Sequence, residues 1–581
     1  MRSLLIYLKE YRKETILAPL FKLLEVLFEL TVPLVVARLI DAGILAGDSR
    51  TVLAMGGLLA LFAAAGLTSA ITAQYFAARA AVGFAANVRQ ALFHKIQTLS
   101  WSQLDTIGTG TLTTRLTSDV NQAQNGVNMV LRLILRSPFV VVGAMIMAFS
   151  VDARAAVIFV LVIPLLSLLV FLIMRRTAPL YKAAQERLDE VLLHTRENLV
   201  GARVVRAFNR QDEEREEFAA ANEALTHTQR LTGAVSGLLN PSTQVVVNAG
   251  IILLILTGAW RVDTGALTKG QIVALLNYMS QILIELVKFA NLIITISRAL
   301  ASADRIALVL NMAQDMADGT EEVPDAEAGT APAVRFDHVS YRYEGAGAEA
   351  LHDITFSAAA GETIGVIGGT GSGKSTLVRL IPRFHDVSAG RVEVFGKDVR
   401  SCRMASLRGI IGVVFQKAEL FAGSIRDNLL YGAADRTAAA DPARLEQVLS
   451  ASQSAEFVAG KPDGVNHMLT QGARNLSGGQ KQRLTIARAL MRGPRILILD
   501  DAASALDFAT DLKLRTAIRQ MSGRMTIFIV SQRVPSVRFA DRILVLDKGH
   551  IVGNGRHEEL LGSCEVYREI YRSQFPEEVT G

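Results

Sequence analysis

Charged and apolar residues are unevenly distributed, and the first half of the chain contains long stretches without charge. No Lys, Arg, Asp or Glu occurs in residues 51–78, 155–174 or 231–260. A helix of about 20 apolar residues is long enough to cross the hydrocarbon core of a bilayer. Each of these stretches therefore predicts a transmembrane helix.

Three further apolar segments contain a few charges each, and we expect them to span the membrane as well. Together the pattern predicts six transmembrane helices within residues 1–305, at about 16–44, 53–84, 127–151, 154–175, 233–260 and 271–300. The charged residues inside these segments include Lys22, Glu25, Glu29, Arg132, Arg136, Glu285 and Lys288.

The intramembrane charges leave two interpretations open. Lys22, Glu25 and Glu29 share one helix face at i, i+3 and i+7, and Glu285 and Lys288 are three residues apart. Charged groups at membrane depth usually face one another or a water-filled cavity. They therefore indicate either a cavity for amphipathic or cationic molecules, or internal Lys–Glu pairs that contact no substrate.

Lys and Arg are concentrated at the N-terminus and in the two long segments 85–126 and 176–232. Because positive residues favour the cytoplasmic side, the N-terminus and both segments are predicted to be cytoplasmic. Their Ala-, Glu-, Arg- and Leu-rich composition is typical of helix, and about 20 extra residues extend a span by roughly 30 Å. A bias of Lys and Arg towards cytoplasmic loops also gives a mild basic excess, so the net charge of +6 need not indicate nucleic acid, and no nucleic-acid partner is expected.

Composition agrees with a membrane protein. Half of the 581 residues are hydrophobic and only 20% are charged, which is too apolar for a soluble globular protein and excludes a disordered one. The two cysteines, Cys402 and Cys564, are too few for a disulfide scaffold and fit a reducing compartment.

After an acidic linker at 306–333, which has no Lys or Arg, the pattern changes. Residues 334–581 alternate short β-branched runs with helical stretches, which predicts an α/β domain. The expected buried strands are 364–367, 411–415, 495–499, 526–530 and 542–546.

A phosphate-binding loop follows the first of these strands. Its eight residues fit G-x-x-x-x-G-K-[ST] and lead into a helical run that begins at Thr376. The residues are Gly368, Gly369, Thr370, Gly371, Ser372, Gly373, Lys374 and Ser375. Backbone N–H groups at a helix N-terminus bind phosphate, Lys374 is expected to neutralise it, and Ser375 is expected to ligate Mg²⁺. Asp500, at the end of the strand 495–499, is expected beside this loop as a further Mg²⁺ ligand.

The pentapeptide 476–480, which contains Ser477, Gly478, Gly479 and Gln480, gives the chain a family resemblance. With the preceding motifs it resembles the ATP-binding cassette (ABC) transporters of exporter type, in which six spans are fused to one nucleotide-binding domain. The resemblance covers nearly the whole chain. It implies that two such domains sandwich two ATP molecules, with the pentapeptide of one subunit placed on the γ-phosphate of the ATP held by the other.

Further positions match the family one at a time. Tyr343 matches the aromatic residue that stacks on adenine, Gln416 the glutamine that links Mg²⁺ to the membrane domain, and Asp507 the loop 504–507 that touches the opposite site. Segments 101–106 and 204–209 match the short coupling helices that transmit motion. Gln471 stands where the family usually has glutamate.

Two departures bear on the mechanism. Asp501 stands where hydrolytic subunits have the glutamate base, and Gln532 stands where they have the switch histidine. Asp is one CH₂ shorter, so its carboxylate falls about 1.5 Å short, and a misplacement near 1 Å costs roughly 10²-fold in rate. Gln cannot carry a proton, and general acid–base help is worth about 10²–10⁴-fold. The pair predicts a site that binds ATP and Mg²⁺ and hydrolyses ATP slowly.

The resemblance therefore points to the degenerate-site half of a heterodimeric multidrug exporter in a prokaryotic plasma membrane. A homologous partner with Glu and His would supply the Walker motifs of the composite site at which most hydrolysis occurs. The expected substrate is a small amphipathic compound. The alternatives are a homodimeric lipid or peptide exporter, and an ATP-gated channel or regulator.

Overall fold

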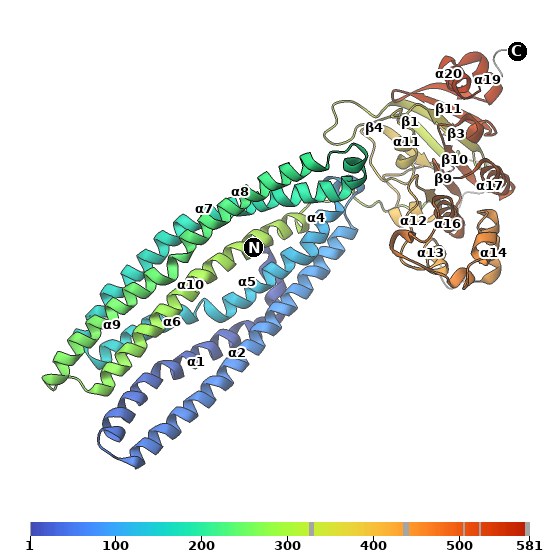
Figure 1. Cartoon of the computed structure of the whole chain (residues 1–581). Helices are drawn as coiled ribbons and strands as arrows, with labels where there is room; N and C mark the ends of the chain where they lie inside the picture. The colour runs from blue at the N-terminus through green and yellow to red at the C-terminus, as the bar shows by residue number, and fades with distance from the viewer. Residues whose placement is uncertain (1, 325–330, 434–440, 503–505, 522–524, 576–581) are drawn as a thin grey trace. The chain divides into compact units, whose positions relative to one another are not determined.

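The computed structural model describes the chain except residues 1, 325–330, 434–440, 503–505, 522–524 and 576–581. It divides into two compact units (Figure 1). The first comprises Met1–Gln97 and Thr109–Met312, and the second comprises Thr98–Gly108 and Ala313–Gly581. The boundary between the two units after α10 lies at Met312, and residues 98–108, which belong to the first predicted cytoplasmic segment, are part of the second unit.

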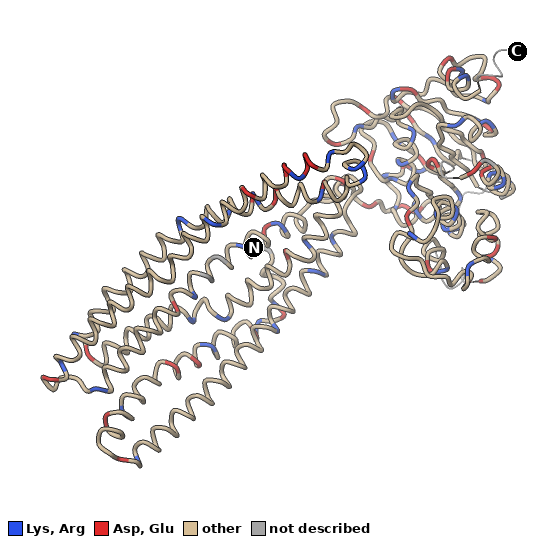
Figure 2. Tube along the Cα trace, viewed as in Figure 1, with Lys and Arg blue, Asp and Glu red and all other residues tan. Residues whose placement is uncertain are grey.

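The first unit is helical throughout its described secondary structure. Its helices are η1 (Arg2–Tyr11), α1 (Arg12–Arg38), η2 (Leu39–Ile44), α2 (Ser49–Gln97), α4 (Thr109–Thr114), η3 (Arg115–Asp119), α5 (Val120–Leu133), α6 (Arg136–Val151), α7 (Ala153–Ala207), α8 (Gln211–Gly237), α9 (Leu239–Asp263) and α10 (Lys269–Leu310). In the N-terminal part of α7 and along most of α9 the trace carries no charge colour, which corresponds to the uncharged runs at 155–174 and 231–260 (Figure 2).

Five helical segments in the described chain are long and apolar enough to cross a membrane. They are Ser49–Gln97, Thr109–Val151, Ala153–Ala207, Gln211–Asp263 and Lys269–Leu310. Each contains one of the predicted spans, and the helices extend beyond these spans, as the predicted helical extensions require. The predicted span 16–44 is also helical but is not among the five, and it carries Lys22, Glu25 and Glu29. Its crossing of the membrane stays a prediction.

The intramembrane charges pair with one another. Lys22 donates to Glu25 at 2.6 Å within α1. Arg136 of α6 lies between Glu285 of α10 at 2.6 Å and Glu29 of α1 at 2.7 Å. Because unpaired charges are costly at membrane depth, these pairs tie three helices together.

Two further contacts complete the group. Ser137 donates to Glu285 at 2.9 Å, and Lys288 donates to the same carboxylate at 2.9 Å. The Glu285 side chain is almost fully buried, whereas 46% of the Lys288 side chain is exposed. Each of the five charged residues on α1 and α10 thus has an ionic partner, and Lys288 also reaches the surface, so the cavity interpretation stays a prediction.

The second unit is built on sheets. Its strands are β1 (Val334–Tyr341), β2 (Leu351–Ala358), β3 (Thr363–Gly368), β4 (Ala389–Val394), β5 (Lys397–Asp398), β6 (Ile411–Val414), β7 (Gly423–Ser424), β8 (Met468–Leu469), β9 (Ile496–Asp500), β10 (Thr526–Val530), β11 (Arg542–Asp547) and β12 (His550–Gly555). They form sheets of order β2-β1-β4-β5, β12-β11-β3-β10-β9-β6 and β7-β8. All five predicted strands are present, and each strand end lies within one residue of its predicted position.

Helices accompany these sheets. They are α3 (Trp101–Ile107), α11 (Lys374–Leu380), α12 (Met404–Gly409), α13 (Ile425–Leu430), α14 (Pro442–Ala451), α15 (Ala455–Ala459), η5 (Gly464–Asn466), η6 (Gln471–Ala473), α16 (Gly478–Met491), α17 (Phe508–Met521), α18 (Val534–Val537), α19 (His557–Ser563) and α20 (Glu565–Gln574). The architecture is thus a helical membrane unit followed by an α/β unit.

The parallel sheet determines where the chemistry gathers. Strands β11, β3, β10, β9 and β6 run parallel, and their apolar side chains are buried on both faces. In register, Val530 of β10 pairs with both Asp500 of β9 and Val366 of β3. The segments that follow β3, β9 and β10 therefore leave the sheet at one edge, where ligands of open α/β sheets bind.

Candidate nucleotide-binding site

A cavity of about 370 Å³ lies at this edge of the sheet. Most of the predicted nucleotide residues line it. The lining residues are Tyr343, Ala350, Thr370, Gly371, Gly373, Lys374, Ser375, Thr376, Gln416, Asp500, Asp501, Val530, Ser531 and Gln532. The fold thus brings together residues that are up to 189 positions apart, from Tyr343 to Gln532.

The phosphate-binding loop connects β3 to α11. Gly373 caps α11 with a left-handed φ of 96°, and a Cβ there would lie 2.7 Å from the carbonyl oxygen of Ala350. Only glycine fits such a position without strain. The loop consequently presents the N-terminus of α11, with its unpaired N–H groups, to the cavity.

Lys374 bridges the loop from within. Its ammonium donates to the carbonyl oxygens of Gly368 at 3.0 Å and Gly369 at 2.5 Å, and lies 3.4 Å from Ser372 Oγ. Burial lowers the pKa of Lys374, although the carboxylates of Asp501 and Asp500 oppose this. The ammonium of Lys374 thus donates to neutral oxygen atoms, and a bound phosphate group would give it a directly hydrogen-bonded anionic partner.

The loop and strand β9 are joined at the residues expected to hold Mg²⁺. Ser375 Oγ donates to Asp500 Oδ1 at 2.7 Å, and Asp500 is only 1% exposed. The second oxygen, Oδ2, is buried without a hydrogen-bond partner, and the nearest cation is Arg379 at 3.8 Å. A buried carboxylate oxygen with spare coordination beside a hydroxyl fits a hard, oxygen-binding cation, so these residues suit Mg²⁺.

Asp501 and Gln416 face each other across the same cavity. The amide of Gln416 donates to Asp501 Oδ2 at 3.2 Å, and Asp501 adopts a left-handed φ of 49°. Burial, followed by the neighbouring charge of Asp500, raises the pKa of Asp501. The short carboxylate is therefore held by an amide at the position where the family's base would orient water.

Tyr343 lines the cavity at the side of α11. Its hydroxyl lies 3.0 Å from Thr376 Oγ1, and its ring packs edge-on against Tyr341 at 4.9 Å and His385 at 5.7 Å. The pair Tyr341–His385 was not predicted, because neither residue belongs to a motif. An aromatic residue with a polar tip, fixed beside the phosphate loop, is suitable for stacking on a planar base.

The pentapeptide segment is placed differently. Among the described residues that line the cavity, none comes from 476–480, and Asp507 is absent as well. Ser477 instead caps α16 through a reciprocal pair with Gln480, at 3.3 Å and 3.1 Å, which leaves Gly478 and Gly479 in the first turn. Asp507 caps α17 by accepting from Thr510 at 2.9 Å and 2.8 Å. Ser504 and Ala505 of the predicted loop lie outside the described residues.

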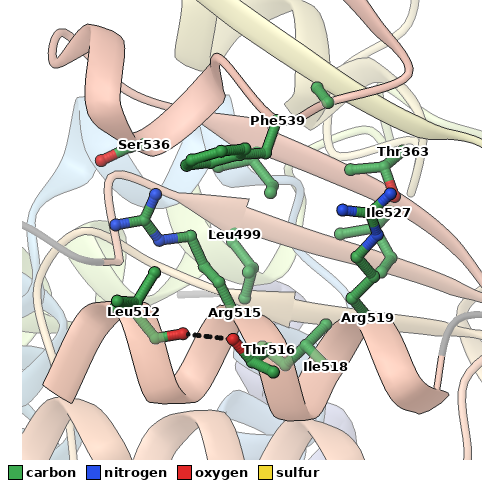
Figure 3. A pocket seen from close by; sticks show the side chains of 12 residues that line it. Thr363, Leu499, Leu512, Arg515, Thr516, Ile518, Arg519, Ile527, Ser536 and Phe539 are labelled. Atoms are coloured by element: carbon green, nitrogen blue, oxygen red, sulfur yellow. Dashed lines mark hydrogen bonds between the residues drawn. The ribbon is translucent and has the colours of Figure 1, made fainter. Parts of the chain in front are cut away.

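A second cavity, of about 250 Å³, lies beneath α17 (Figure 3). Its floor is apolar, and the view shows the side chains of Arg515 and Arg519 on either side of Leu499, with Phe539 opposite the helix. It contains none of the predicted site residues, so the first cavity is the candidate nucleotide site.

Comparison with known proteins agrees with this geometry. The model of the ABC transporter transmembrane region matches residues 15–286, and the ABC transporter model matches residues 351–504. An uncharacterized ABC transporter ATP-binding protein of Mycobacterium tuberculosis is 36% identical over 98% of this chain and 97% of its own length. This chain is an ABC transporter.

Two other relatives refine the comparison. A fatty acid ABC transporter ATP-binding/permease protein of Mycobacterium bovis is 32% identical over 82% of this chain and 74% of its own length. The solved structure of a bacterial Atm1-family ABC exporter with ATP bound is 25% identical, with a TM-score of 0.79 over 97% of this chain and 98% of that one. The ABC transporter described here thus has the exporter arrangement, with a membrane region fused to an ATP-binding domain.

The first segment predicted to be a coupling helix, 101–106, is helical in this transporter and lies within α3. Ser100 caps it, and Trp101 stacks on Phe384 at 4.6 Å and packs against Phe415 at 5.5 Å. Phe415 directly precedes Gln416 of the nucleotide cavity. The helix therefore lies one residue away from a cavity-lining side chain.

The second predicted coupling helix, at 204–209, is not a separate helix. It is the end of α7, which continues to Ala207 and is followed by a turn at Phe208 and Asn209. Val204 and Phe208 are 59% and 74% exposed. Residues 202–207 contain neither glycine nor proline, so the regular hydrogen bonding of α7 continues through them instead of giving way to a new element.

Proposed function

We propose that this ABC transporter exports amphipathic compounds across a prokaryotic plasma membrane as the degenerate-site half of a heterodimer. The observation that carries the proposal is the composition of one cavity. Lys374, Ser375 and Asp500, which we assign to the phosphates and Mg²⁺, line it together with Asp501 and Gln532, which we assign to the base and switch positions. Such a site is suited to binding ATP and poorly suited to hydrolysing it.

Different residues of the cavity bind different parts of the nucleotide and its metal ion. Lys374 and the loop N–H groups bind the phosphates, Tyr343 stacks on the base, and Ser375 with Asp500 holds Mg²⁺. Mg²⁺ would neutralise charge on the β- and γ-phosphates. Asp501, held by Gln416, reaches less far than Glu toward an attacking water, and Gln532 offers an amide without a titratable proton.

The intact pentapeptide supports a partner. The start of α16, capped by Ser477 and Gln480, lies outside the chain's own cavity, so its N–H groups are available to a second nucleotide. A partner with Glu and His at the altered positions would supply a competent phosphate loop and base opposite it. Hydrolysis would then take place mainly at that composite site.

The membrane unit supports an amphipathic substrate. On α10, Asn277, Ser280 and Lys288 are exposed, whereas the exposed side chains of α7 within the bilayer are apolar, such as Leu161 and Phe171. A polar stripe facing lipid tails is costly, so this face of α10 is expected to line a pathway. Apolar neighbours such as Ile284 on the same face suit a molecule with both polar and apolar parts.

A homodimeric lipid exporter is the second candidate, because one relative is named as a fatty acid transporter. The two candidates differ in the hydrolysis expected of the isolated chain. Purified alone in lipid nanodiscs, this chain should show ATPase activity close to that of its Lys374→Ala variant. Vigorous hydrolysis by the pure chain, at several turnovers per second, would contradict the heterodimer and favour the homodimeric exporter.

A further inference from the structure

The backbone at the switch position, Gln532, is hydrogen-bonded to the side chain of the last residue of the C-terminal helix. The side chain of Gln532 lines the nucleotide cavity, while its backbone carbonyl accepts a hydrogen bond from Gln574 Nε2 at 2.8 Å. The same amide accepts, through Oε1, the N–H of Val534 at 2.8 Å. One side chain thus spans the backbone of the turn that carries Gln532.

An amide is the side chain that this arrangement requires. The carbonyl oxygen of Gln532 needs a donor and the N–H of Val534 needs an acceptor, and a single glutamine supplies both. A carboxylate supplies only the acceptor, and an apolar side chain supplies neither. The residue type at 574 is therefore matched to the two backbone groups it contacts.

The helix that presents Gln574 is firmly packed. Val534 and Val537 of α18 and Tyr567 of α20 are fully buried in one apolar cluster, and Phe575 packs against it. The hydroxyl of Tyr567 is in turn 2.7 Å from His557 Nδ1 of α19. The packing of the C-terminal helices therefore fixes the position of the Gln574 amide.

We propose that Gln574 is a positioning residue that sets the place of the switch side chain at 532, so that helix α20 controls how long this chain's site retains ATP. This inference rests on the proposed nucleotide site and adds an element of the chain that belongs to none of its nucleotide motifs. Gln532 reaches the γ-phosphate side of the cavity only while its backbone is fixed. Displacement of α20 would release that backbone and speed nucleotide loss.

The test measures the release of labelled ATP from the full-length chain in nanodiscs with Mg²⁺ present. If the chain is purified with a different subunit, the phosphate-loop lysine of that subunit is replaced, so that only this chain's site is read. Gln574→Met removes both hydrogen bonds, and Gln574→Glu removes only the donor to the Gln532 carbonyl. Arg572→Gln, an exposed change two residues away on α20, is the matched control.

Loss of one such hydrogen bond corresponds to about a five- to tenfold change in rate. We expect both Gln574 variants to release ATP about five- to tenfold faster, at an unchanged unfolding temperature, and the control to be unchanged. Faster release in Gln574→Met alone would show that the bond to Val534 matters and would overturn the role assigned to the Gln532 carbonyl. Unchanged release in both variants would overturn the inference outright.

A second arm excludes a merely structural effect. In a Gln532→His background, a switch histidine makes hydrolysis depend on pH around its own pKa, near 6.5 in the absence of perturbation. If Gln574 positions residue 532, Gln574→Met should shift or abolish that pH profile. Lys374→Ala serves as the separate check: unchanged nucleotide binding in that variant refutes the nucleotide site itself, whereas lost binding with an unaltered Gln574 result refutes only the inference.

Discussion

The hydroxyl of Ser375 donates a hydrogen bond to Asp500 across 2.7 Å, and this bond joins the phosphate loop to strand β9, which ends at Asp500. The other oxygen of Asp500 is buried without a hydrogen bond. Buried carboxylate oxygens are normally satisfied, so an unsatisfied one beside a hydroxyl indicates a place for a cation. We therefore expect ATP binding at this site to depend on a metal ion, and this dependence can be measured.

Removing the hydroxyl should weaken the dependence of ATP binding on Mg²⁺. We expect Ser375→Ala to lower ATP affinity about tenfold or more in Mg²⁺, because one oxygen ligand is lost, and to have little effect in EDTA. Ser375→Thr keeps the hydroxyl and is the control. Equilibrium binding of a fluorescent ATP analogue, with and without Mg²⁺, measures both affinities. Equal losses under the two conditions would refute the metal assignment.

Restoring the two altered side chains should convert the site. In the chain purified alone, Asp501→Glu with Gln532→His is expected to raise ATPase activity by about 10²-fold or more, because it returns both reach and a titratable proton. Each single change should give only part of the gain. Steady-state phosphate release measures this. A double variant no faster than the native chain would mean that these two positions are not what limits hydrolysis.

The nucleotide site was largely predictable because its key residues lie in short contiguous motifs. The spacing around Lys374 and the strand before Asp500 can be read locally, and the parallel sheet then places their ends together. Tertiary partners could not be predicted in this way. His385 and Gln574 belong to no motif, and their contacts with Tyr343 and Gln532 depend on how helices and loops pack.

In the membrane unit, too, contacts between different helices could not be predicted from the sequence. Residues on one helix, such as Glu285 and Lys288, were placed together by their spacing. The central role of Arg136 was not foreseen, because it depends on the approach of α6 to α1 and α10. Sequence periodicity gives the face of a helix, whereas contacts between helices require their relative rotation.

Arg136 should therefore matter more for stability than the exposed cation of the same group. Arg136→Met leaves the buried Glu285 and nearby Glu29 without the guanidinium between them, and breaking a buried pair costs about 3–5 kcal/mol. Lys288→Met should cost much less, because Glu285 keeps Arg136 and Ser137. Thermal unfolding in nanodiscs compares the two. Equal losses would contradict the central position of Arg136.

His385 packs against Tyr343 of the nucleotide cavity, and the residue before it, Phe384, stacks on Trp101 of helix α3. Burial, and secondarily the charge of Arg379, lowers the pKa of His385, while Asp105 of α3 opposes the shift. In the unfolded chain the imidazole titrates near 6.5. The folded state thus binds fewer protons below that pH than the unfolded state, and His385 makes folding stability fall as pH drops through about 6.5.

The stability of the ATP-binding unit should show this slope, at up to about 1.4 kcal/mol per pH unit for one group. Trp101 stacks on Phe384, the neighbour of His385, so its fluorescence in a Trp260→Phe background reports unfolding of this region. Between pH 7.5 and 5.5 we expect His385→Gln to lose less stability than the native chain. Asp105→Asn should lose more, because the group that favours protonation is removed and the pKa of His385 falls further. Since the other histidines are common to all three proteins, identical slopes would show that His385 is not held neutral by its surroundings.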